Sequence, residues 1–324
     1  MPLLRRVALA ADFVDQPAER KSHITPVPYL GGVGIMIAVL LSLLFESGPL
    51  LSLAVLVVAS AVLGLVGLID DARGLNPMPR LAIQFSAAAA ATSVGIRAEV
   101  TGVPILDVAV TVLWIMGITN AFNLIDNMDG LAAAVALTSA GGVFLIAALG
   151  GQRLVATLAA GVAGACLGFL AHNRPPARIF MGDAGSLFLG FVVALAALTV
   201  DAPLARPAIL SVPLLLVAIP LLDTGTVTIA RLRNGRPIAQ GGKDHLSHRI
   251  ARRTGSRGVA VLLLVLAQAL LAGLAVGIAH GVLAAPVVMV LALIVLGAVA
   301  SGAWPVQIYS EPPAGLATQP EPPA

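Results

Sequence analysis

Long apolar runs recur along the chain, and each is about as long as a helix that crosses a lipid bilayer. Such a helix needs about 20 apolar residues, and glycines, prolines and charged residues separate the runs. The approximate limits of the predicted spans are 29–46, 49–69, 81–97, 104–122, 131–149, 154–171, 184–200, 207–230, 258–280 and 281–303. The pattern predicts an all-α integral membrane protein with about ten transmembrane helices.

The basic residues fall almost entirely on one side of these spans. Only Arg97, Arg153 and Arg206 lie in the loops of the opposite side. The other 16 Lys and Arg residues lie in the connections at 1–28, 70–80, 123–130, 172–183, 231–257 and 304–324. Because Lys and Arg accumulate in cytoplasmic loops, this side is predicted to face the cytoplasm of a multi-pass protein in the cell membrane.

Composition supports the membrane assignment and excludes other classes. Of the 324 residues, 58% are hydrophobic and 11% are charged, which is far from a soluble domain. The 19 basic residues follow membrane topology, so no nucleic-acid partner is predicted. One cysteine excludes a disulfide framework. No secretory signal is visible at the start, and the Pro-rich segment 310–324 is predicted to be a disordered tail after a membrane domain at 1–309.

Acidic residues cluster at the cytoplasmic ends of the predicted spans, which suggests a single site. Asp70 and Asp71 directly follow an apolar run, and two adjacent carboxylates repel each other unless a cation or a shared proton relieves them. A second cluster spaces polar residues by three at the end of a span: Asn120, Asn123, Asp126 and Asp129. This spacing predicts that the four lie near one helix face, with a bend at Gly130.

Two further clusters complete the predicted site. Asp183 opens a span, where an isolated Asp usually caps the helix, but the neighbouring clusters favour a functional role. Asp223 lies inside a predicted span, and ionisable residues within the membrane are functional candidates. His245 and His248, in the longest cytoplasmic loop, suit a phosphate or a metal, although zinc would need more ligands than their spacing supplies.

The residue types in these clusters indicate the chemistry of the ligand. Carboxylate and amide oxygens prefer Mg²⁺, with Mn²⁺ as an alternative, over soft metals, and basic side chains bind phosphates. A diphosphate bridged by Mg²⁺ that meets a lipid-borne phosphate would use both at a membrane surface. The sequence has no phosphate-binding P-loop and no dinucleotide-binding glycine pattern, which argues against ATP-driven transport.

Five motifs, in order, resemble those of the polyprenyl-phosphate N-acetylhexosamine-1-phosphate transferases of glycosyltransferase family 4. They cover nearly the whole chain and lie at Asp15–Gly32, Asp70-Asp71, Asn120–Leu131, Met181–Ser186 and Asp244–His248. The resemblance implies transfer of a sugar-1-phosphate from a UDP-N-acetylhexosamine to undecaprenyl or another polyprenyl phosphate. It implies that UMP is released. It also implies that the transfer is the first membrane step in the synthesis of a cell-envelope polysaccharide such as lipopolysaccharide or teichoic acid.

The resemblance also implies roles for individual residues. Asn123 and Asp183 would hold Mg²⁺, and Asp70 with Asp71 would deprotonate or position the lipid phosphate for a direct displacement. Phe180 would stack on the uracil base. The other residues that it places near the substrates are Arg20, Lys21, His23, Arg80, Asn120, Asp126, Asp129, Asn173, His245, His248 and Arg249, with His245 counted among the catalytic residues.

The chain departs from the family pattern in three places. Asn127 stands where the family usually carries Gly, and Asn is predicted to tolerate the left-handed backbone conformation of that turn. The histidine group is sparser than usual around His245 and His248. A further span generally precedes the opening motif, so either the natural start lies upstream or this form lacks a helix. A homodimer is common in the resembling family.

Three alternatives remain open from the sequence. The paired prolines of the opening motif and the Asp244–His248 loop resemble the branch of the family that uses UDP-N-acetylglucosamine more than the branch that uses the muramoyl-pentapeptide donor of peptidoglycan synthesis. An ion-coupled secondary transporter could use the acidic residues, but transporters bind near the membrane midplane, often within repeated halves. A non-catalytic scaffold would not need acidic clusters at four helix ends.

Overall fold

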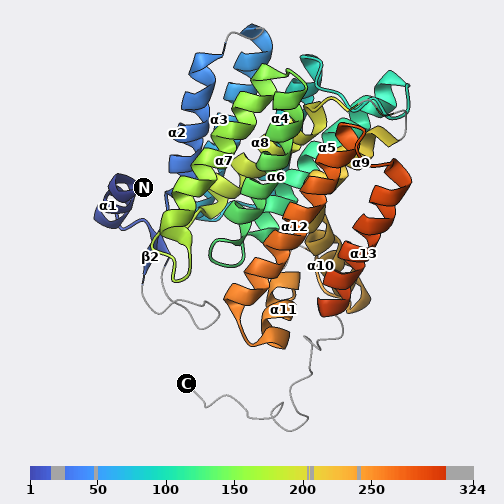
Figure 1. Cartoon of the computed structure of the whole chain (residues 1–324). Coiled ribbons are helices and arrows are strands. Elements are labelled where there is room, and N and C mark those ends of the chain that lie inside the picture. The colour runs from blue at the N-terminus through green and yellow to red at the C-terminus, as the bar shows by residue number, and fades with distance from the viewer. Residues whose placement is uncertain (16–25, 47–49, 203, 205–207, 239–241, 304–324) are drawn as a thin grey trace.

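The structure, a computed structural model, describes residues 1–15, 26–46, 50–202, 204, 208–238 and 242–303. It is almost entirely helical (Figure 1). The helices are α1 Pro2–Ala10, α2 Gly31–Ser42, α3 Leu50–Arg73, α4 Pro77–Ser93, α5 Pro104–Ile125, α6 Leu131–Leu149, α7 Arg153–Asn173, α8 Gly182–Thr199, α9 Ser211–Leu216, α10 Ala218–Arg233, α11 Leu246–Thr254, α12 Arg257–Ala279 and α13 Ala285–Ala303. Two 3₁₀ turns, Leu43–Phe45 and Ala208–Leu210, and two short antiparallel strands, β1 Val14–Asp15 and β2 Val27–Pro28, complete the described elements.

Seven helices of the described chain are long and apolar enough to cross a membrane, namely α3, α5, α6, α7, α8, α12 and α13. The all-α, multi-pass membrane class is therefore confirmed. The number of ten spans is not. The expected span at 29–46 forms the 12-residue helix α2 and a 3₁₀ turn, and the span at 81–97 corresponds to the 17-residue helix α4. The expected tail at 310–324 lies outside the described residues.

The predicted span at 207–230 is wrong as a continuous helix. The segment Ala208–Leu216 and helix α10 meet at an angle of 86°. Pro220 accounts for the break, since proline has no N–H and its ring clashes with the carbonyl four residues earlier. Gln268 of α12 pairs the backbone groups at the break: its Nε2 donates to the carbonyls of Leu215 and Leu216, and its Oε1 accepts from Ile219 N–H. The apolar pattern alone did not reveal this break.

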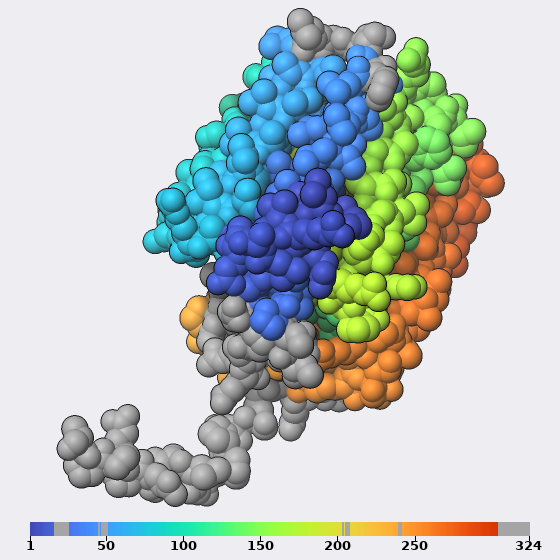
Figure 2. All heavy atoms as spheres, turned by 90° about the vertical axis from the view of Figure 1, so that its left-hand side faces the viewer, coloured from blue at the N-terminus to red at the C-terminus, as the bar shows by residue number. Residues whose placement is uncertain are grey.

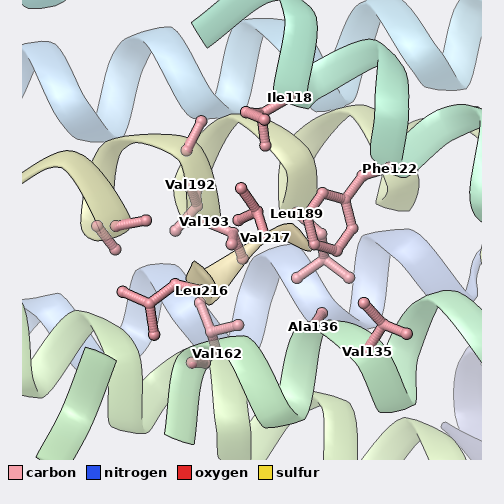
Figure 3. Close-up of a cluster of buried hydrophobic side chains, with 14 of the residues drawn as sticks. Ile118, Phe122, Val135, Ala136, Val162, Leu189, Val192, Val193, Leu216 and Val217 are labelled. Carbon is pink, nitrogen blue, oxygen red and sulfur yellow. The ribbon is translucent and has the colours of Figure 1, made fainter. Parts of the chain in front are cut away.

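Helix α8 is the centre of the helical bundle. Its Leu189, Val192 and Val193 lie against side chains of α5, α6 and α7 and of the α9–α10 break, as Figure 3 shows. It is the most buried of the seven candidate spans, whereas α13 is the least buried. The apolar side chains that α13 leaves exposed match a lipid-facing position. Asp183 lies at the start of α8 and is therefore carried by the best-packed element of the fold.

The connection 231–257, expected to be a loop, contains helix α11, so that expectation is wrong for residues 246–254. Gly255 ends the helix in the left-handed conformation. Figure 1 shows α11, the end of α10 and β2 at the lower end of the molecule. Figure 2, a view of another face, shows α1 lying across the surface beside α2 and α7. A hydrogen bond from Arg5 Nε to the carbonyl of Arg178 links α1 to the segment after α7.

Candidate active site

A single guanidinium joins carboxylates from two helices. Asp70, in the last turn of α3, accepts a hydrogen bond from Arg80 Nη1 at 2.7 Å. The same nitrogen lies 3.3 Å from Oδ2 of Asp183 at the start of α8. The second oxygen of Asp70 accepts from Leu75 N–H at 2.6 Å. Arg80 Nε is buried and has no hydrogen-bond partner within the described residues, so Arg80 keeps a donor for a further acceptor.

Asn123 completes this arrangement from α5. Its Nδ2 donates to Asp183 Oδ1 at 2.7 Å and to Ser186 Oγ at 3.0 Å. Asp183 therefore faces Arg80 on one side and an amide on the other. The structure thus brings together four residues that were predicted to lie in one site, from α3, α4, α5 and α8: Asp70, Arg80, Asn123 and Asp183.

Asp71 has a different role from Asp70. Its carboxylate accepts from the N–H groups of Asp183 at 2.8 Å and Ala184 at 3.1 Å. These are orphan donors at the start of α8, so Asp71 caps this helix from another helix. Asp183 lies in the first turn of α8, whose N-cap position is Met181, so Asp183 is not the capping residue of this helix. Asp71 thus positions Asp183 through the backbone.

Close backbone packing also fixes the start of α8. A Cβ placed on Gly32 of α2 would lie 2.2 Å from the backbone nitrogen of Gly185. A Cβ on Gly67 of α3 would lie 2.3 Å from the carbonyl oxygen of Asp183. No side chain fits at either position. The glycines of the opening motif and of the Met181–Ser186 motif therefore serve helix packing, which holds Asp183 in place.

The expected helical stripe ends earlier than its spacing indicates. Helix α5 stops at Ile125, so Asp126 and Asp129 lie beyond it and that prediction is wrong for both. Gly130, the N-cap residue before α6, has a φ of 78°, which confirms the expected bend. Burial, reinforced by the negative charges of Asp183, Asp71 and Asp129, raises the pKa of the half-buried Asp126 to about 7. Negative charge is thus concentrated beside Asp183.

Three residues predicted to contact substrate make protein hydrogen bonds that shape the site. Asn173 is buried and accepts from Gly130 N–H while donating to the carbonyl of Ile179. Asp129 accepts from the N–H of Ala177 at 3.0 Å. Both hold the connection that leads from α7 to Phe180. Asn120 donates to Gln84 Oε1 on α4 and to its own helix. Gln84 is a buried partner that the sequence analysis missed, since one Gln in an apolar helix gives no signal.

Phe180 lies in an aromatic group at the N-terminal strands. Its ring centroid is 6.4 Å from that of Tyr29, which is 5.6 Å from Phe13. The backbone N–H of Phe180 donates to the carbonyl of Pro28, and the carbonyl of Phe180 accepts from the N–H of Gly31. Burial, together with a hydrogen bond to and the charge of Asp15, raises the pKa of Tyr29, so its hydroxyl stays protonated.

The remaining predicted residues of the opening motif cannot be placed. Arg20, Lys21 and His23 lie outside the described residues.

Buried charge pairs hold the histidine segment. Arg231 of α10 binds Asp244 through two hydrogen bonds of 2.8 Å, and both side chains are 3% exposed. Asp223, the acidic residue singled out inside a span, binds His245 Nδ1 at 2.7 Å and also accepts from Leu246 N–H. This carboxylate fixes the orientation of the His245 ring.

His248 and Arg249 lie in the first turns of α11. The ring of His248 is 6.4 Å from that of His245. Burial, together with the positive charges of His245, Arg257 and Lys243, lowers the pKa of His248 to about 4. His248 is therefore neutral at pH 7, while Arg249 donates to the carbonyl of Asp244 at 2.8 Å.

Asn127 connects the carboxylate part of the site, around Asp70 and Asp183, with the histidine part, around His245. Its Oδ1 accepts from Ser247 Oγ of α11 at 2.5 Å, and its Nδ2 donates to the carbonyl of Leu124. The expected left-handed conformation at Asn127 is wrong, because only Asp12 and Leu30 among the described non-glycine residues have positive φ.

The donor set fits a hard divalent cation that substrate helps to hold. No three Asp, Glu, His or Cys side chains of the described residues form a ready metal cage. Mg²⁺, however, is usually held by one or two carboxylates together with water and substrate phosphates. The carboxylate of Asp183 and the neighbouring amide of Asn123 supply such a partial shell. Asp126 lies close enough for the charge of Asp183 to raise its pKa, so a further carboxyl group is near the same place.

Comparison with known proteins places the chain in a family. The profile described as Glycosyl transferase family 4 matches residues 53–201. A probable undecaprenyl-phosphate N-acetylglucosaminyl 1-phosphate transferase of Bacillus subtilis is 34% identical over 82% of this chain and 77% of its own length. A decaprenyl-phosphate N-acetylglucosaminephosphotransferase of Mycolicibacterium smegmatis is 35% identical over 81% and 74%. A phospho-N-acetylmuramoyl-pentapeptide-transferase of Clostridioides difficile is 32% identical over 61% and 69%.

The matched profile includes Asp70, Asn123 and Asp183, which lie at the ends of α3, α5 and α8 and are joined through Arg80 and the Asn123 amide. The relatives extend the match over most of the chain. The protein therefore belongs to glycosyl transferase family 4, the polyprenyl-phosphate N-acetylhexosamine-1-phosphate transferases.

Proposed function

We propose that the protein transfers N-acetylglucosamine-1-phosphate from a UDP-sugar to undecaprenyl or another polyprenyl phosphate and releases UMP. The observation that carries this proposal is the group formed by Asp70, Arg80, Asn123 and Asp183 at the ends of apolar helices. The names of the Bacillus subtilis and Mycolicibacterium smegmatis relatives agree with this reaction.

In the proposed reaction an oxygen of the lipid phosphate attacks the β-phosphorus of the UDP-sugar. A new P–O bond forms, and the bond between the β-phosphorus and the oxygen it shares with the α-phosphorus breaks. The electron pair of that bond leaves with UMP, and the sugar stays on a polyprenyl diphosphate. Positioning and charge neutralisation dominate such phosphoryl transfers.

In this proposal the cluster around Asp183 binds the substrate phosphates, through a metal ion and through Arg80. Mg²⁺, or Mn²⁺ in its place, would be held by Asp183 and Asn123 and would neutralise charge on the diphosphate. Arg80 has a spare donor at Nε and lies between Asp70 and Asp183. When a phosphate draws the Arg80 guanidinium away, Asp70 Oδ2 is free to take the proton of a monoprotonated lipid phosphate.

The histidine segment orients the donor substrate in this proposal. Asp223 holds Nδ1 of His245, which leaves Nε2 to contact a phosphate oxygen. Phe180 would stack on uracil, since an aromatic ring at the edge of the site suits a planar base. The Lys and Arg residues of segments 174–178 and 231–257 support the proposal that this end of the bundle faces the cytoplasm.

The test is release of UMP by the purified full chain. Undecaprenyl phosphate and Mg²⁺ are supplied with UDP-N-acetylglucosamine or, in parallel, with UDP-N-acetylmuramoyl-pentapeptide. We expect UMP with the first donor and none after chelation of the metal. Turnover with the pentapeptide donor alone would move the protein to the branch of the Clostridioides difficile relative, and absence of UMP with both donors would contradict the proposal.

A further inference from the structure

The side chain of Asn127 is fixed at both ends of its amide. Nδ2 donates to the carbonyl of Leu124, at the end of α5, at 2.9 Å, and Oδ1 accepts from Ser247 at 2.5 Å. Exchanging the amide nitrogen and oxygen would set two oxygens against each other at Leu124, so the network assigns this orientation. Ser247 is 1% exposed and lies in the first turn of α11.

This hydrogen bond joins segments that are 120 residues apart in the sequence. On one side, the loop 126–130 carries Asp126, whose neighbours include the charges of Asp183 and Asp71. On the other side, α11 follows directly after His245 and carries Arg249. Where the family pattern has glycine, no side chain could make this bond.

We infer that Asn127 is a positioning residue that aligns the histidine segment with the acidic loop through Ser247. A UDP-sugar that contacts both the histidine segment and the acidic loop requires a fixed position of one relative to the other. A small displacement of binding groups lowers the reaction rate strongly. The inference rests on the proposed function for its kinetic consequence. The linkage between the two segments does not depend on that function.

The kinetic test is a double-mutant cycle in the full chain. Asn127→Ala and Ser247→Ala should each lower kcat/KM for the UDP-sugar about tenfold, and the double variant should be no worse than either single one, because the same bond is lost. KM for polyprenyl phosphate should stay unchanged. Additive losses, or single variants with wild-type kcat/KM, would overturn the inference.

A matched control separates positioning from simple destabilisation. Ser139→Ala removes another fully buried serine hydroxyl, but one whose hydrogen bond among the described residues goes to the carbonyl of Val135 within its own helix α6. It should leave kcat/KM at the wild-type value. A loss equal to that of Ser247→Ala would show that any buried hydroxyl matters, and would also overturn the inference.

Amide hydrogen exchange tests the linkage even if the wild-type protein proves inactive with both donors. Asn127→Ala should speed exchange at the first amides of α11, and Ser247→Ala should speed exchange in loop 126–130, while Ser139→Ala does neither. Unchanged exchange in both segments would contradict the linkage. Faster exchange without turnover in the wild type would refute the proposed function alone.

Discussion

The two parts of the site are held in different ways. The carboxylate part, with Asp70 and Asp183, is built on helices whose backbones touch at Gly32, Gly67 and Gly185. The histidine part, with His245, is held by side chains, through the buried pairs of Arg231 with Asp244 and of Asp223 with His245. The first part depends on backbone shape and the second on paired charges.

This difference predicts how each part fails. A polar substitution in the carboxylate part leaves the packed backbones in contact, so it should remove chemistry and keep the fold. Removing one partner of a buried charge pair leaves the other charge uncompensated, which strongly destabilises a protein.

Asp183→Asn should reduce UMP release by at least about 10²-fold, the usual cost of losing one electrostatic group that acts in a reaction. The amide has nearly the same shape, so the thermal unfolding temperature should stay close to that of the wild type. Asp201→Asn, exposed beyond the opposite end of α8, is the matched control and should keep full activity. Near-normal turnover of Asp183→Asn would remove Asp183 from the chemistry.

Arg231→Met should lower the free energy of unfolding by about 3–5 kcal/mol, because the buried Asp244 carboxylate loses the charge of Arg231 and both hydrogen bonds from its guanidinium. Chemical or thermal denaturation in detergent measures this change. Arg233→Met, an exposed arginine of the same helix, should have little effect. If Arg231→Met proved as stable as the wild type, the histidine part would not depend on its charge pair.

Phe180→Ala should raise KM for the UDP-sugar about fivefold, since an aromatic stack contributes on the order of 1 kcal/mol. Steady-state kinetics of UMP release measures it, with Phe180→Tyr as the variant that keeps the ring. An unchanged KM in Phe180→Ala would mean that this ring serves only the packing against Tyr29.

His248 should make the fold sensitive to acid. Its pKa is lowered to about 4 in the folded protein, from an ordinary value of 6.5. The unfolded chain therefore takes up a proton at a pH where the folded protein does not, so stability present above pH 6.5 is lost as the pH falls towards 4. His248→Gln should lose less thermal stability than the wild type between pH 6.5 and 4. An identical decline in both would contradict a buried, neutral His248.

The membrane class and the composition of the site could be predicted because they depend on local features. An apolar run that is long enough to cross a bilayer is stable there as a helix, since backbone polar groups in lipid must form their hydrogen bonds within the segment. Asp70, Asn123 and Asp183 were predicted to form one cluster because each lies at the end of an apolar run, and Asp183 contacts both Arg80, which binds Asp70, and Asn123.

The sequence did not predict features that depend on contacts between distant segments. The break before α10 follows from Pro220 but needs Gln268 of α12 to pair the open backbone. Asp70 and Asp71 are neighbours in one helix, yet one faces Arg80 and the other caps α8. The two side chains point in different directions from α3, and the spacing of residues in the sequence does not indicate those directions.

The order of apolar and polar residues was thus enough to identify a helical membrane protein and the family it resembles, and to predict which residues bind a cation and phosphates. Which of these residues face one another, and which side chains support them, follows from the folded arrangement of the helices. Hydrophobic length and residue chemistry are local properties of the chain, whereas the bond between Asn127 and Ser247 exists only because folding brings the loop after α5 against α11.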